Sequence, residues 1–144
     1  YFPTRKDLMG AVFDWANERI GFDGQLPTTG AESAALARRV FPGFDEIAPI
    51  IHELLIAPEG RSARLAGNAR RQEAALAVVH HEAPGLDEVS SRRVAAAVHL
   101  LTTAGAWQSL RDYWDMDGTE AAEAAALAIR LLLAGARTCA EPMS

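Results

Sequence analysis

Residues 94–107 read VAAAVHLLTTAGAW, and residues 123–136 read EAAALAIRLLLAGA. Nearly every position in both stretches is apolar or small, without the strict alternation typical of a half-buried strand. Two helices of this composition must be covered on almost every side, which exceeds what one small bundle usually buries. The two stretches therefore predict an all-α protein in which a second copy of the chain covers the last two helices.

Hydrophobic periodicity and end signals elsewhere predict four further helices. Thr4, Thr29 and Asp117 have the position and chemistry of N-caps, and Pro42 and Pro84 are expected to end the helices before them. The predicted helices span residues 5–20, 31–41, 49–57, 58–83, 87–112 and 118–134.

The composition restricts what the chain can bind. It has 144 residues with 19 acidic and 14 basic side chains, a net charge of −5, and so lacks the basic face that binding to a phosphate backbone requires. The single Cys139 excludes an internal disulfide, and no apolar run approaches the roughly 20 residues of a membrane span. We expect one cytoplasmic domain without a cofactor, a metal or a membrane contact.

The first eight residues, YFPTRKDL, resemble a segment of the TetR family of bacterial transcriptional repressors. In that family the segment ends the DNA-reading recognition helix and enters the fourth helix. The matching positions are an aromatic pair, a helix cap, a basic residue and an apolar anchor, here Tyr1, Phe2, Thr4, Arg5 and Leu8. Lys6 stands where an acidic residue is common in the family.

A second resemblance lies near the other end of the chain. The residues that carry it resemble the family's last two helices and the turn between them. They are Trp107 and residues 110–112, 116–117, 120–122 and 132–135. Residue matches cover only the two ends, whereas the order of helices agrees throughout. The resemblance implies a TetR-like C-terminal domain of about six helices, whose last two form a four-helix bundle between subunits. Residues 5–144 would sense a ligand and dimerise, and residues 1–4 would remain from a helix-turn-helix domain.

The function that this resemblance implies is ligand-responsive transcriptional regulation. We expect a homodimeric repressor that a small apolar or amphipathic effector releases from its operator, with the DNA bound through a missing N-terminal domain. The first predicted helix would connect that domain to the sensor, so its displacement would misplace both recognition helices. The residues expected near DNA are Tyr1, Thr4, Arg5 and Lys6.

A ligand pocket is expected inside the first five helices. His99 and Thr102 lie one turn apart in an apolar segment, where an unpaired polar group costs about 1 to 3 kcal/mol. Either core neighbours or a ligand must satisfy them, and Asn68 and Gln72 pose the same alternatives. The predicted pocket residues are Phe13, Phe41, Phe44, His52, Leu55, Asn68, Gln72, His99, Thr102 and Trp107.

Small residues on the last two predicted helices would let helix axes approach closely across a two-fold axis. The predicted dimer interface comprises Ala104, Gly105, Ala121, Ala124, Ala125, Ala128 and Leu132. A monomer that buries the same helices in its own core is the alternative.

Motifs of enzymes are not recognised in the sequence. Two His-Glu pairs begin like the HExxH motif of zinc proteases, but Ile56 and Gly85 occupy the place of the second histidine. The arginines of residues 61–71 have glutamates on both sides and are interpreted as a solvated helix face. The alternative function is therefore a helical homodimeric interaction module without DNA binding.

Overall fold

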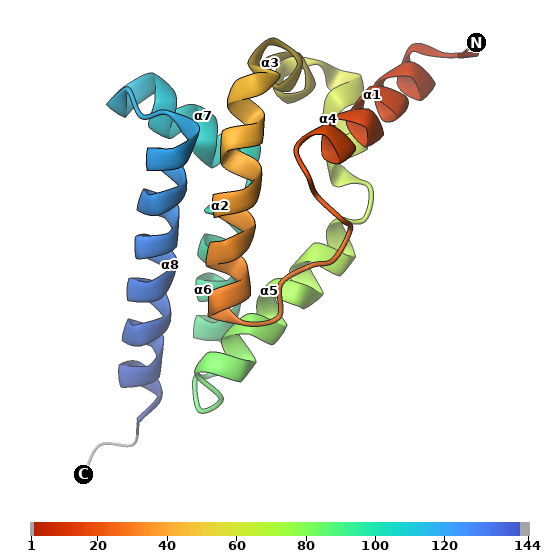
Figure 1. Ribbon diagram of the computed structural model, residues 1–144. Coiled ribbons are helices and arrows are strands. Elements are labelled where there is room, and N and C mark those ends of the chain that lie inside the picture. Colours follow the sequence, from red (N-terminus) through yellow and green to blue (C-terminus); the bar gives the residue numbers. More distant parts are fainter. Residues whose placement is uncertain (1, 142–144) are drawn as a thin grey trace.

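The computed structural model describes residues 2–141, and this part of the chain consists of α-helices and connecting turns, without a strand (Figure 1). The all-α class is confirmed, but the predicted number of about six helices is wrong. Tyr1, one of the predicted DNA-proximal residues, lies outside the described range. The eight helices are α1 (Arg5–Arg19), α2 (Gly30–Glu46), α3 (Ala48–Ile56), α4 (Pro58–Leu65), α5 (Asn68–Glu82), α6 (Glu88–Leu100), α7 (Ala104–Trp114) and α8 (Gly118–Ala140).

The predicted N-caps are confirmed by their hydrogen bonds. The Thr4 hydroxyl accepts from the Asp7 backbone N–H at 3.0 Å at the start of α1. Thr29 and Asp117 accept from the N–H three positions further on, at 3.1 and 2.9 Å, where α2 and α8 begin. Each of these side chains satisfies a donor that the first helical turn would otherwise leave unpaired.

The prediction that Pro42 ends the second helix is wrong, because α2 continues to Glu46. A proline inside a helix costs about 3 kcal/mol. Phe41 and Phe44, on either side of the proline, are both buried in the core. Burial of each ring contributes about 1.5 to 3 kcal/mol, which offsets the cost of continuing the helix.

Two long predicted helices are each divided into two. Residues 58–83 form α4 and α5, because Gly67 adopts a left-handed backbone with a φ of +75°. Residues 87–112 form α6 and α7. Between these helices the Thr102 and Thr103 hydroxyls donate to the carbonyls three residues earlier, at 2.8 and 2.7 Å, which favours a turn over a continuous helix.

The last helix continues past Gly135, where the sequence predicts its end. Gly135 does not adopt the positive φ of a helix-ending glycine. The next residue, Ala136, is buried within the chain, so packing extends α8 to Ala140.

Helices α2 and α8 lie side by side and antiparallel, and they form the most extensive helix pair of the fold (Figure 1). The α5–α6 hairpin packs along them, and α7 crosses the end of the pair where α8 begins. Helices α1 and α4 pack on each other at the side of the molecule. Within the described range, no helix combines the length and the apolar character needed to cross a membrane.

The core has two hydrophobic clusters. The first surrounds Trp107, whose ring is fully buried and packs on Phe44 with a centroid distance of 5.4 Å. The Trp107 indole N–H donates to Asp45 at 2.9 Å, and Asp45 also accepts from the Gly118 N–H at the start of α8. The second cluster joins α5, α6 and α8 through Val78, Val79, Val98, Ile129 and Leu133.

Candidate ligand cavity and outer helix face

A cavity of about 460 Å³ lies among α1, α2, α3 and the two junctions where predicted helices are divided. Its size falls within the range of about 300 to 1,000 Å³ that is usual for small-molecule sites. The α4–α5 and α6–α7 junctions both contribute to its wall. Of the predicted pocket residues, the cavity brings together Phe13, Phe44, Leu55, Asn68, His99 and Thr102.

Helix α1 forms one wall of this cavity. Phe13, Ala16, Asn17 and Ile20 all line it, at the i, i+3, i+4 and i+7 spacing of a single helix face. The segment that resembles the entry into a connecting helix therefore continues into a helix that touches the cavity directly. Asn17 is a polar lining residue that the sequence analysis missed.

Two polar residues of the α6–α7 segment reach the wall. Thr102 lines the cavity, and its hydroxyl already donates to the His99 carbonyl at 2.8 Å. The pKa of the His99 imidazole is lowered, first by burial and second by the positive charge of Arg71. His99 is consequently a neutral group at neutral pH, with donor and acceptor nitrogens available to the cavity wall.

Arg64 and Arg71 also line the cavity, so their interpretation as part of a solvated face is wrong. Their neighbours Arg61 and Arg70 are exposed, as that interpretation requires. Residues Asn68, Arg71, Ala75 and Val78 are spaced three or four positions apart, so they share one face of α5, and this face lines the cavity. The sequence pattern could have revealed this face.

Four predicted pocket residues lie elsewhere. Phe41 and Trp107 are fully buried in the first core cluster, where they pack against protein rather than line a space. The His52 ring packs edge-on with the Trp107 ring, with a centroid distance of 5.8 Å. Gln72 is exposed on α5, since it lies one residue beyond the face that lines the cavity.

The predicted dimer residues separate into three groups. Ala121 and Ala125 are fully buried against the chain's own helices, so a second chain cannot contact them and this part of the prediction is wrong. Ala104 and Gly105 line the cavity instead of an outer face. The half-buried residues of the set, on α8, are Ala124, Ala128 and Leu132.

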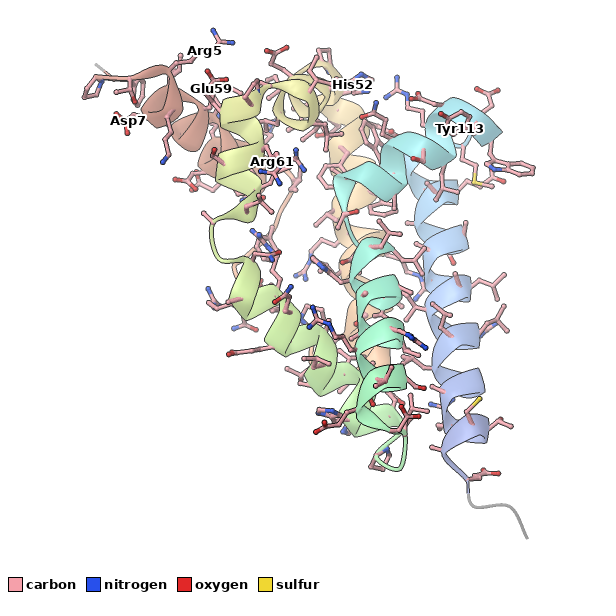
Figure 2. The ribbon with its side chains drawn as sticks, turned by 180° about the vertical axis from the view of Figure 1, so that it is seen from behind. Arg5, Asp7, His52, Glu59, Arg61 and Tyr113 are labelled. Atoms are coloured by element: carbon pink, nitrogen blue, oxygen red, sulfur yellow. The ribbon has the colours of Figure 1, made fainter. Side chains whose placement is uncertain are left out.

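Larger apolar side chains project from the outer sides of α7 and α8. Leu127 and Leu131 of α8 are 47% and 61% exposed, and they lie beside Ala124 and Ala128 on the helix surface. Tyr113 and Trp114 are exposed at the end of α7, and Figure 2 shows Tyr113 at the tip of that helix. We call Ala124, Leu127, Ala128 and Leu131 the outer face of α8, whereas Leu132 packs against the second core cluster.

At the start of α1, the side chains of Thr4 and Arg5 form contacts within the chain. The Arg5 guanidinium forms ion pairs with Glu59 at 3.2 Å and Glu53 at 3.9 Å, and Figure 2 shows Arg5 and Glu59 at the same corner. Arg5 therefore pairs with carboxylates of α3 and α4, which would have to release it before it could reach a phosphate. Lys6 is exposed, and Thr4 caps the helix.

Comparison of the chain with protein-family models, with curated proteins and with solved structures finds no match.

Proposed function

We propose that this chain is the ligand-sensing and dimerising domain of a TetR-like, helix-turn-helix transcriptional regulator, a repressor that a small effector releases from DNA. The observation that carries the proposal is the contribution of α1 to the wall of a ligand-sized cavity. α1 begins with the segment that resembles the link to a recognition helix. The DNA-reading unit would precede Thr4.

Ligand binding would act through α1. A ligand that fills the cavity contacts Phe13, Asn17 and Ile20, and it therefore favours one position of α1 over another. In a dimer, the displacement of both α1 helices changes the separation of the two recognition helices, which must match two DNA half-sites. Effector and operator binding are then coupled by about 1 to 3 kcal/mol.

Dimerisation would bury the outer face of α8 against the same face of a second copy. Such an interface is self-complementary under two-fold symmetry. Burial of a leucine such as Leu127 or Leu131 contributes about 1.5 to 3 kcal/mol, and the neighbouring alanines allow close approach of the two α8 helices. Two copies of α7 and α8 would form the bundle between subunits.

Intact mass measurement of the protein expressed from its natural start codon tests this proposal. Denaturing mass spectrometry is expected to give a subunit well above 15.5 kDa, and native mass spectrometry a dimer of it. The additional sequence should contain a helix-turn-helix, and the protein should bind DNA. A dimer of 15.5 kDa subunits without DNA binding would instead support the homodimeric interaction module.

A further inference from the structure

The wall of the cavity carries positive charge without a matching negative charge. Arg64 and Arg71 both line it, whereas none of the described residues that line it is an aspartate or glutamate. Among the described residues, neither arginine forms an ion pair. The remainder of the wall is mostly apolar, so the charge lies in a poorly solvated environment.

Arg64 is already committed to the fold. Its Nε donates to the Leu54 carbonyl at 3.2 Å, and its Nη2 donates to the Leu55 carbonyl at 3.3 Å. These carbonyls belong to the last turn of α3, where a helix leaves acceptors unpaired and favours a cation. Arg64 therefore closes the end of α3.

Arg71 retains unused donors. Its Nη1 donates to the carbonyls of Arg64 and Ala66, at the end of α4, and both bonds use this one nitrogen. The Nε and Nη2 groups take no part in them. Burial lowers the pKa of Arg71, and the charge of Arg70 lowers it further. Arg71 is therefore a half-buried cation with unused donors, to which an anion could add charge-assisted hydrogen bonds.

Two neutral groups lie in the wall with Arg71. Asn68 is one turn earlier on the same face of α5, and His99 projects from α6. An amide N–H and an imidazole N–H are both suitable donors to a carboxylate oxygen. Leu65 and Leu100 line the cavity while remaining exposed, so the cavity opens beside these polar residues.

We propose that the cavity binds an amphipathic monoanion, such as a medium-chain carboxylate, with its head group on Arg71 and its apolar body against α1 and α2. This assignment rests on the proposed function, because it names the effector class of the same cavity. Asn68 and His99 orient the head group, and Phe13 and Phe44 contact the apolar body. The anion neutralises the charge that the fold leaves unpaired.

Isothermal titration calorimetry of the unmodified chain with three probes of equal chain length tests the assignment. Decanoate is expected to bind at least about tenfold more tightly than decanol, because its carboxylate accepts charge-assisted hydrogen bonds from Arg71. Decylamine is expected to bind more weakly than decanol, because it brings a second positive charge to Arg71. Equal or tighter binding of decanol would overturn the anion assignment.

Variants identify the residue responsible. Arg71→Gln is expected to lose the preference for decanoate over decanol, and Arg71→Lys to retain part of it. Arg70→Gln is the matched control, because it removes the same charge one residue away from the cavity wall and should keep the preference within about twofold. Full preference in folded Arg71→Gln would overturn the role of Arg71. If Arg71→Gln fails to fold, Arg71→Lys and the three probes on the unmodified chain still test whether the cavity prefers an anion.

Native mass spectrometry of the calorimetry samples separates the two proposals. A dimer that prefers decanol, or that binds none of the probes, overturns the anion assignment and leaves the proposed regulator domain standing. A monomer that prefers decanoate supports the anion site and contradicts the dimerising function.

Discussion

His99 lies in the cavity wall where the α6–α7 segment meets the start of α5. Its identity as a cavity residue was predicted from its place in an apolar helix. The cause of its altered ionisation was not predictable in that way, because Arg71 is 28 positions earlier in the chain and meets it only in the fold.

The lowered pKa of His99 predicts a pH dependence of stability. The unfolded chain binds a proton at His99 below about pH 6.5, whereas the folded chain resists it because the site is buried and faces Arg71, with Arg64 also in the wall. The free energy of unfolding should therefore fall as the pH drops below 6.5, until His99 protonates in the folded state.

Urea denaturation of the unmodified chain and of His99→Gln at several pH values measures this effect. The variant should lose less stability on acidification than the unmodified chain. His80→Gln, which alters an exposed histidine of α5, is the control and should keep the original dependence. Identical pH profiles for His99→Gln and the unmodified chain would show that His99 does not carry the effect.

Gly43 is a second residue whose role became visible only in the fold. A Cβ atom there would lie 2.9 Å from both Cα and Cβ of Ile20, so α2 and the end of α1 approach closely at this glycine. Gly43→Ala should lower the free energy of unfolding by about 1 to 3 kcal/mol through overpacking.

Gly10→Ala is the matched substitution, since both glycines are helical and a Cβ at Gly10 has no neighbour within 4 Å. It should raise the free energy of unfolding by about 0.5 to 1 kcal/mol, through helix propensity. Urea midpoints that move in the same direction for both variants would contradict the close contact of Gly43.

At the scale of the helices, the sequence predicts beginnings better than ends and breaks. N-caps depend on residues three positions apart, so Thr4, Thr29 and Asp117 were recognisable. The continuation of α2 through Pro42 depends on the burial of aromatic rings against other helices, which local pattern does not contain. The break at Gly67 is a local signal that was overlooked inside a periodic stretch.

Asp45 connects three helices, and its removal should have a large effect. The carboxylate at the end of α2 accepts from Trp107 of α7 and from Gly118 at the start of α8. Asp45→Ala leaves a buried indole N–H unpaired and should lower the free energy of unfolding by about 1 to 3 kcal/mol.

The adjacent Glu46→Ala is the control for Asp45, because Glu46 is exposed and ends the same helix. Its free energy of unfolding should stay within about 0.5 kcal/mol of the unmodified chain. Equal effects of the two substitutions in urea denaturation would contradict the connecting role of Asp45.

At the scale of the whole molecule, the all-α class follows from composition. The sequence does not determine which face of an apolar helix its own chain covers. Ala121 and Ala125 were expected at a dimer interface, yet α2 covers them, and Leu127 and Leu131 project instead.

The outer face of α8 predicts the effect of a charge on assembly. Leu131→Glu should convert a dimer into a monomer while preserving the helical fold, because a buried unpaired carboxylate costs several kcal/mol in the interface alone. Ile56→Glu places the same charge at an exposed position at the end of α3 and should leave the dimer intact. Light scattering distinguishes the two, and a dimeric Leu131→Glu would exclude this face.

The most direct measurement of the central claim is the distance between the two α1 helices of a dimer. A spin label is attached to the new thiol of the variant Lys6→Cys, with Cys139→Ser to remove the other thiol. Pulsed electron paramagnetic resonance then gives the distance between the labels of the two subunits. Saturation with decanoate, or with decanol if that binds instead, should shift this distance by about 1 to 2 Å per helix. An unchanged distance in the saturated dimer, or no dipolar coupling between subunits, would contradict the account of a dimeric sensor that acts through α1.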